Sequence, residues 1–216
     1  MNDIPEKPKI YHLTHVENLQ GIFSSGAVLS DSIRLCQAPA HTNVGISGIK
    51  RRRLEELEVS CHPGTKVGEY VPFYFCPRSI MLFLIYRGNH PDLTYRAGQN
   101  SIVYFEADLR RVIAWANGEG KRWAFTDANA GARYASFYCS LAHLDKINWE
   151  AVSATDFRDP LIKDRKQAEF LLHESFPVDL IETVGAINSS VAAHANQIIL
   201  NNGHTINVDI KPEWYF

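Results

Sequence analysis

The chain has 216 residues, and at roughly 150 residues per domain this length predicts a single domain over residues 1–216. Hydrophobic residues make up 45% and charged residues 21% of the sequence, which excludes disordered, collagen-like and coiled-coil proteins. No apolar run approaches the roughly 20 residues that span a bilayer, and the first residues lack the basic and apolar stretches of a signal peptide. We therefore expect no membrane contact and a cytoplasmic location.

The net charge of −2 hides an asymmetry along the chain. Residues 1–143 hold 16 basic and 13 acidic side chains, whereas residues 144–216 hold 6 and 11. The field of the whole molecule is therefore too weak to attract a polyanion. If nucleic acid binds, a local basic groove must hold it.

The first predicted elements are a strand over residues 9–13 and a helix that follows a tight turn. Thr14 and Glu17 have the spacing of a capping box, and Gly26 suits the left-handed position that ends a helix. Residues 30–47 show no periodicity and match no element.

Periodicity and capping residues predict the later elements. In chain order these are a helix from about Gly48, a loop over 61–69, an edge or bulged strand over 71–75, a helix over 79–86, a strand over 101–105, a helix over 108–118, strands near 123–125, 168–172, 184–188 and 205–210, and a helix over 190–200. The elements lack a regular strand–helix–strand rhythm, and a Gly-x-Gly-x-x-Gly motif is absent, so a Rossmann sheet is disfavoured. We predict an α+β domain with a mostly antiparallel core sheet.

Four cysteines lie far apart in the sequence, and no two of them form a Cys-x-x-Cys pair. They are Cys36, Cys61, Cys76 and Cys139. In a cytosolic chain this spacing favours reduced, mostly buried thiols over a disulfide framework or a zinc site.

Glu169 is the most informative single residue, because it interrupts the apolar strand over 168–172. Strand alternation places Glu169 and His173 on one face and Phe170 on the other. A buried carboxylate without a partner would cost several kcal/mol. Either its face is solvated, or Glu169 pairs with Lys166 or with an arginine.

Residues 50–53, Lys-Arg-Arg-Arg, form the densest positive charge of the chain. On a helix Arg52 and Arg53 point about 100° apart, so the run cannot face one ligand as a whole. One interpretation is a solvated helix surface balanced by the nearby glutamates. The other is that one guanidinium points inward, to a phosphate or to a catalytic carboxylate.

Two further motifs leave a structural and a functional interpretation open. His12 and His15 are three residues apart, but no third ligand is evident, so a metal site is disfavoured against a core or capping histidine or a ligand-binding turn. Residues 69–79 contain four aromatic residues, two prolines and Arg78. These rings form core, or they stack on planar groups such as nicotinamide, adenine or a DNA base.

Taken together, four segments resemble the DarT family, DNA ADP-ribosyltransferase toxins of bacterial toxin–antitoxin pairs. The segments are residues 10–19, 49–53, 70–79 and 166–171, and the resemblance continues to Trp214. It implies an ADP-ribosyltransferase fold like that of poly(ADP-ribose) polymerases, with a split, mostly antiparallel central sheet and NAD+ in the cleft. It further implies transfer of ADP-ribose from NAD+, as substrate, to a base in single-stranded DNA, commonly thymidine, without a metal. The implied partner is a macrodomain antitoxin.

The resemblance also assigns roles to individual residues. Glu169 matches the catalytic glutamate, and Arg53 best matches the family's arginine, with Arg52 one position away. The residues that match positions near the nicotinamide and its ribose, or that would wall the cleft, are His12, Thr14, Asn18, Tyr70, Phe73 and Met81. Arg52, Arg78 and Arg133 are the candidates for contacts with nucleic acid.

The implied chemistry suits these residue types. Cleavage of the nicotinamide–ribose bond passes through an oxocarbenium-like state that a carboxylate stabilises. The same Glu169 could remove the proton from thymine N3, helped by a nearby arginine. The alternative function is a non-catalytic module that binds single-stranded nucleic acid on the same fold. A metal-dependent nuclease is disfavoured, because the sequence has no clustered set of carboxylates.

Overall fold

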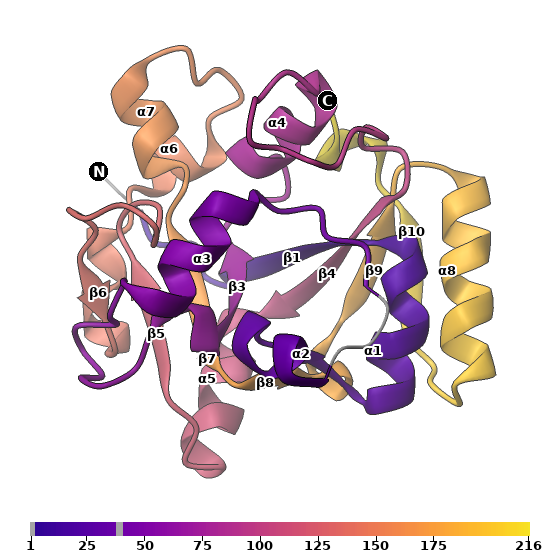
Figure 1. The fold of residues 1–216 in the computed structure, drawn as a ribbon, viewed down its shortest axis with the longest axis horizontal. Helices are drawn as coiled ribbons and strands as arrows, with labels where there is room; N and C mark the ends of the chain where they lie inside the picture. Colours follow the sequence, from indigo (N-terminus) through magenta and orange to yellow (C-terminus); the bar gives the residue numbers. More distant parts are fainter. Residues whose placement is uncertain (1–2, 38–40) are drawn as a thin grey trace.

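An eight-stranded sheet runs through the computed structural model, which describes residues 3–37 and 41–216 (Figure 1). In spatial order its strands are β10 (Asn207–Ile210), β9 (Thr183–Ala186), β4 (Ile102–Asp108), β1 (Lys9–His15), β3 (Tyr70–Tyr74), β7 (Glu169–His173), β5 (Trp123–Thr126) and β6 (Phe137–Tyr138). Only the pair β10 and β9 is parallel. β2 (Ala27–Leu29) and β8 (Ser175–Pro177) form a separate antiparallel pair. The predicted α+β architecture with a mostly antiparallel sheet is confirmed.

Helices cover both faces and one end of this sheet. They are α1 (Leu19–Ser25), α2 (Asp31–Gln37), α3 (Ser47–Glu55), α4 (Ile80–Arg87), α5 (Leu109–Gly118), α6 (Trp149–Ser153), α7 (Pro160–Arg165) and α8 (Ser189–Asn201). Short 3-10 turns occur at η1 (Val16–Asn18), η2 (Val67–Glu69), η3 (Leu141–Lys146), η4 (Val178–Leu180) and η5 (Pro212–Trp214). In Figure 1, α2 and α3 lie in front of the middle strands, and α8 lies beside α1.

Apolar side chains on both faces of the sheet are buried. Along β4, Val103 and Phe105 belong to the main core, whereas Ile102 and Tyr104 face a second cluster on the other side. Alternate residues of a strand point to opposite faces, so each face of β4 has its own apolar cover. The sheet is therefore shielded from water on both sides near its centre.

The sheet is split between β1 and β3. β1 pairs with β4 along its whole length, but its register with β3 consists of one pair, Tyr11 with Tyr74. Pro72 has no N–H to donate, which prevents a regular ladder at this point. β3 is not an edge strand, because β7 pairs with its other side. The predicted irregularity is nevertheless present, and it opens the sheet at its middle.

Several predicted helix ends agree with the structure, and one does not. The side chains of Ser79 and Asp108 cap α4 and α5, and Gly26 ends α1 with a φ of 74°. Thr14 does not cap the first helix, because η1 begins at Val16 and Thr14 lies one residue before the cap position. His15 takes that position, and its side chain accepts a hydrogen bond from the Glu17 N–H.

Other features differ from the sequence predictions. α2 lies in the aperiodic segment 30–47, of which residues 38–40 fall outside the described part. Cys76 is buried, but Cys36 and Cys139 are exposed and Cys61 is half-buried, so the prediction of mostly buried thiols is wrong. Within the described residues, no helix combines the length and the apolar character that crossing a bilayer requires.

Candidate active site

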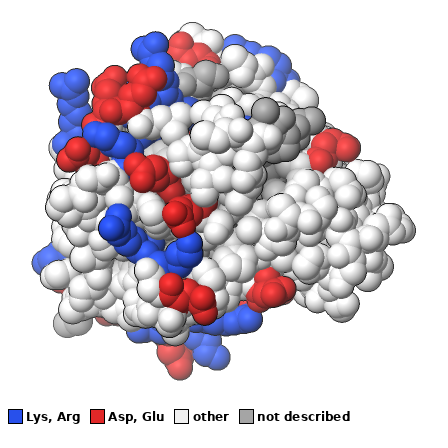
Figure 2. Space-filling model, turned by 60° about the horizontal axis from the view of Figure 1, so that its bottom comes forward, with Lys and Arg blue, Asp and Glu red and all other residues white. Residues whose placement is uncertain are grey.

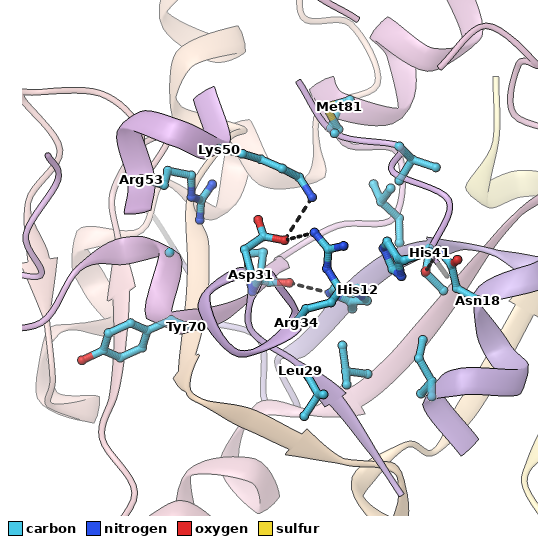
Figure 3. Close-up of a pocket in the computed structure, with 18 of the residues that line it drawn as sticks. His12, Asn18, Leu29, Asp31, Arg34, His41, Lys50, Arg53, Tyr70 and Met81 are labelled. Carbon is cyan, nitrogen blue, oxygen red and sulfur yellow. Dashed lines mark hydrogen bonds and ion pairs between the residues drawn. The ribbon is translucent and has the colours of Figure 1, made fainter. Parts of the chain in front are cut away.

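A cavity of about 450 Å³ opens where β1 and β3 separate (Figure 3). This volume lies in the range of about 300–1,000 Å³ that ligand pockets occupy. Residues of β1, β3, α2 and α3 line it. The space exists because β1 and β3 pair at one position only, so their side chains beyond that pair have no neighbouring strand. The lining residues from β1 and β3 are His12, Leu13, Thr14, Tyr70, Pro72 and Tyr74, and all three residues of β2 line the cavity as well.

Glu169 is fully buried at the start of β7, where it lies opposite Tyr74 of β3. Arg53 donates two hydrogen bonds to its carboxylate, from Nη2 to Oε2 at 2.8 Å and from Nη1 to Oε1 at 3.4 Å. Residues directly opposite on antiparallel strands point to the same face, so Glu169 points to the same side as Tyr74, which lines the cavity. Glu169 itself lies outside the lining, behind Arg53. Arg53 lines the cavity and connects it to the carboxylate.

The loop after β5 supplies a third donor to Glu169. The Ala130 N–H donates to Oε1 at 2.9 Å, and the preceding residue, Asn129, lines the cavity. The Glu169 N–H in turn donates to Oγ1 of Thr126 at 3.0 Å. All three side-chain contacts come from N–H groups, so each of them stabilises the charged carboxylate.

Close packing of α3 on η2 directs Arg53 inward. A Cβ atom on Gly68 would lie 2.9 Å from Cα of Leu54, so only glycine allows this approach. Arg52, one position earlier, points elsewhere and pairs with Glu56 at 3.7 Å. Of the interpretations left open for the basic run, inward pairing with a carboxylate therefore holds for Arg53, and surface pairing holds for Arg52.

A second charged group joins α2 and α3. Nη2 of Arg34 and Nζ of Lys50 both donate to Oδ1 of Asp31, at 2.8 and 3.1 Å. Figure 3 shows both cations converging on one oxygen of Asp31, with Arg53 on one side of the group and His41 and Asn18 on the other. All of these residues line the cavity.

Burial and charge act against each other in this group. Burial favours the neutral acid of Asp31, but Lys50 and Arg34 outweigh it and hold the pKa of Asp31 below its usual value. Burial lowers the pKa of Lys50, although Asp31 opposes this shift. Burial, together with Arg34 and Lys50, also lowers the pKa of His41 to about 4. His41 is therefore neutral near pH 7.

His12, Thr14 and Asn18 lie together on the β1 side of the cavity. His12 donates from Nδ1 to the Pro72 carbonyl at 2.8 Å, since a carbonyl can only accept. Burial lowers the pKa of His12, which leaves Nε2 as an acceptor. Nδ2 of Asn18 donates to Oγ1 of Thr14 at 3.1 Å, and the Asn18 amide also exchanges two hydrogen bonds with the Thr42 backbone.

The other predicted cleft residues are placed differently. Met81 lines the cavity, but Phe73 lies outside the lining and packs in the core against Phe176. Strand alternation explains this, because Phe73 points away from the face of Pro72 and Tyr74. Tyr70 borders the cavity, yet its ring points away (Figure 3) and its hydroxyl is 2.9 Å from Oγ1 of Thr65.

The arginines predicted to contact nucleic acid do not form one group. Arg78 lies with its guanidinium 4.5 Å above the Phe216 ring, and its Nε is buried without a hydrogen-bond partner. Arg133 is exposed and lines a smaller cavity with Ala130 and Phe137. On the face shown in Figure 2, positive and negative side chains are mixed on one half, and the other half is largely uncharged.

Sequence reasoning missed Asp31, Arg34 and His41, because they lie in the segment without periodicity. It also missed Ala130, because this residue contributes its backbone N–H, and almost every residue type has one. Lys50 was noted only as part of the basic run. The three-residue spacing of Lys50 and Arg53 was the available signal, since residues at i and i+3 share a helix face.

Comparison with known proteins gives consistent results. A family model described as "ssDNA thymidine ADP-ribosyltransferase, DarT" matches residues 11–216. A DNA ADP-ribosyl transferase of Thermus sp. (strain 2.9) is 33% identical over 215 residues, which covers 98% of each chain. The structure of Thermus sp. 2.9 DarT in complex with ADP-ribosylated ssDNA matches with a TM-score of 0.87 and 31% identity over 98% of each chain. The structure of that protein with NAD+ matches with a TM-score of 0.83 and 30% identity, covering 99% of this chain and 100% of the other.

Proposed function

This chain belongs to the DarT family of single-stranded DNA thymidine ADP-ribosyltransferases, and from that premise we propose that Glu169 and Arg53 carry out the transfer. The enzyme uses NAD+ as its substrate and attaches ADP-ribose to a base in single-stranded DNA. One observation supports the assignment most strongly. A fully buried carboxylate with three N–H donors lies beside a cavity in the split sheet.

Glu169 serves the first half of the reaction through its charge. The bond between nicotinamide and ribose breaks, and its electron pair leaves with nicotinamide, so positive charge develops on the ribose. A fixed carboxylate in a site with little water stabilises that charge much better than bulk solvent does. Arg53 and the Ala130 N–H hold the carboxylate in place, so little reorganisation is needed.

Glu169 serves the second half as a base. Thymine N3 carries a proton, which passes to the carboxylate as the N3–ribose bond forms. Arg53 is bidentate with Glu169, and its charge offsets the negative charge that develops on the thymine. The overall products are the modified base, nicotinamide and one proton.

The remaining cavity residues divide into two groups. Arg34 and Lys50 are cations with only one carboxylate, Asp31, between them, and we assign them to the diphosphate of NAD+. His12, Thr14 and Asn18 keep the role near the nicotinamide ribose that the family resemblance gives them. Met81 forms an apolar part of the cavity wall. Phe73 takes no part, because it lies in the core.

For the DNA, Arg133 is the best supported of the three predicted contacts. It is exposed on the loop whose Ala130 N–H binds Glu169, so a strand that places a base at Glu169 passes close to it. Binding of a single-stranded oligonucleotide should weaken steeply with salt, and Arg133→Ala should reduce the log–log salt slope by about 1. The control is Arg158→Ala, which removes an exposed arginine that pairs with Asp156. It should leave the slope unchanged. An unchanged slope in both variants would exclude Arg133 from the DNA contact.

The family resemblance further implies a toxin that a macrodomain antitoxin opposes. This role is consistent with an enzyme that modifies DNA bases, because such modifications obstruct copying of the strand. The toxin role and the antitoxin partner remain predictions.

Mass spectrometry of oligonucleotides after incubation with NAD+ tests the proposed function. A set of single strands that each contain one kind of base in varied contexts reports activity, base and context together. We expect an increase in mass by one ADP-ribose unit on thymidine-containing strands, without added metal. Binding of the strands without any adduct would favour the alternative, a non-catalytic binding module.

A further inference from the structure

Cys61, His62 and Cys139 form a cluster that the reaction above does not use. Cys61 and His62 lie in the turn between α3 and η2, and Cys139 directly follows β6. Three ligand atoms lie within 4.8 Å of one another: Sγ of Cys61, Sγ of Cys139 and one ring nitrogen of His62. None of the three residues lines the large cavity. Among the described residues, this is the group of three or more His, Cys, Asp and Glu side chains whose ligand atoms converge.

The hydrogen bond of His62 prepares its ring for coordination. Nε2 lies 2.9 Å from the Trp123 carbonyl, and a carbonyl can only accept, so Nε2 carries the proton. Nδ1 is left with a free lone pair. Metal-bound histidines in proteins almost always donate their other ring N–H to a carboxylate, a carbonyl or water in this way. The contact with Trp123 therefore leaves Nδ1 as the ring nitrogen that is available to a cation.

We propose that Cys61, His62 and Cys139 bind one thiophilic divalent cation, and that Zn²⁺ fits them best. Zinc bonds to sulfur at about 2.3 Å and to imidazole nitrogen at about 2.0–2.1 Å, so ligand atoms around a tetrahedral zinc lie roughly 3.5–3.8 Å apart. The three ligand atoms must approach one another by no more than about 1 Å, which small rotations of side chains supply. Cys139 is exposed, so water can take the fourth position.

The donor set selects the class of cation. Two thiolates and an imidazole suit zinc and other soft or borderline metals, whereas Mg²⁺ and Ca²⁺ require oxygen ligands. The two thiolate charges also match a divalent cation. Two cysteines that lie this close in space can instead form a disulfide, which would remove both ligands. The experiment must therefore distinguish a disulfide from a metal site.

The position of the cluster defines what a bound cation would do. Cys61 and His62 follow α3, which carries Arg53, and Cys139 follows the segment that carries Ala130. Both segments donate a hydrogen bond to Glu169. A cation would join them on the side away from the cavity lining and hold both donors at a fixed separation. Its role is positioning, and it contacts no substrate. The inference does not rest on the proposed reaction.

Titration of the tag-free, full-length protein with Co²⁺ and then Zn²⁺ tests this site. The protein is first freed of metal with a chelator and kept reduced with a phosphine. We expect one equivalent of Co²⁺ to give thiolate-to-cobalt charge-transfer absorption, and Zn²⁺ to displace it and raise the melting temperature. Cys139→Ser should weaken Zn²⁺ binding at least 100-fold, because it removes one of three ligands. Cys36→Ser changes an exposed cysteine outside the cluster and should leave the affinity unchanged.

Three results would overturn the site. The first is the absence of charge-transfer absorption with Co²⁺. The second is equal Zn²⁺ affinity of wild type and Cys139→Ser, with Cys61→Ser as a second variant and circular dichroism as the check on folding. The third is a peptide that links Cys61 to Cys139 through a disulfide in protein purified without reductant, together with no metal binding after reduction. That combination would assign the pair to a disulfide.

Discussion

Two carboxylates beside the cavity meet cations from the same helix, yet their surroundings differ. Glu169 is fully buried and accepts hydrogen bonds from Arg53 and Ala130, whereas the Asp31 side chain is 25% exposed and contacts Lys50 and Arg34. α3 serves both acids, because Lys50 and Arg53 are three residues apart and share a helix face. The difference in burial separates a fixed pair suited to chemistry from an adjustable group suited to binding.

The physical reason is the dielectric environment. Interactions between charges are several times stronger away from water than at a surface, so the Arg53–Glu169 pair keeps its geometry. Asp31 lies in the open lining of the cavity, and the two cations carry one more charge than the acid. An anionic ligand can therefore compete with Asp31 for Lys50 and Arg34. The variants of Glu169, Arg53 and Lys50 below separate these two roles.

The largest effect is expected from Glu169→Gln. The amide keeps the size of the side chain but can neither stabilise a cationic ribose nor accept the thymine proton. We expect the rate of adduct formation to fall by about 10³-fold or more, while oligonucleotide binding is retained. Glu182→Gln is the matched control, since that carboxylate pairs with Lys9 at 2.5 Å outside the cavity lining, and it should remain active. Comparable rates in the two variants would contradict the role of Glu169.

Arg53→Ala and Arg52→Ala separate the inward from the outward arginine. Arg53→Ala should lose more than 10-fold in turnover, equivalent to about 1.4 kcal/mol or more of transition-state stabilisation. Arg52→Ala removes a surface pair with Glu56 and should change turnover less than about 2-fold. Rates at saturating NAD+ measure both, with thermal melting as the check on folding. If Arg52→Ala were the more damaged variant, the helix register would be wrong.

Lys50→Met should act on binding instead of chemistry. Loss of a charge-assisted contact to a diphosphate predicts an increase of about 10-fold in KM for NAD+, with kcat nearly unchanged. Arg51→Met alters the adjacent, exposed position of α3 and should leave KM as it is. A fall in kcat at constant KM would place Lys50 with the catalytic pair and remove the distinction between the two groups.

The smallest predicted effect concerns His41 and stability against pH. The pKa of His41 falls from its ordinary 6.5 to about 4 in the folded protein, so the unfolded chain binds the proton more readily. The stabilising contribution is complete above about pH 6.5 and is lost as the pH falls toward 4. His41→Gln should therefore reduce the drop in melting temperature between pH 7 and pH 5, by roughly 2 °C. An identical drop in both proteins would contradict the shift.

The sequence predicted those parts of the site that local patterns encode. β1 and the caps at Ser79 and Asp108 follow from alternation and side-chain hydrogen bonding. An acid in an apolar strand left two interpretations of Glu169 open, a solvated face or a pair with Lys166 or an arginine, and the family motif favoured Arg53. Only the packing of Gly68 on Leu54 shows which arginine points inward.

Other parts depend on contacts between distant segments. α2 has no buried residues, so it leaves no periodic pattern, and Asp31 gains its partners only when α3 lies beside it. The family resemblance placed Phe73 at the cleft, and the aromatic segment itself does not show which face of its strand is core. The cysteine cluster arises because β6 brings Cys139 to a turn far away in the sequence.

A double-mutant cycle on Arg53 and Glu169 tests most directly whether the buried pair acts as one catalytic unit. Single-turnover adduct formation is measured for wild type, Arg53→Ala, Glu169→Gln and the double variant. The rate loss of the double variant should nearly equal that of Glu169→Gln alone, since an arginine that works through the carboxylate has nothing left to support. Losses that multiply would mean that the two residues act independently and would contradict the account.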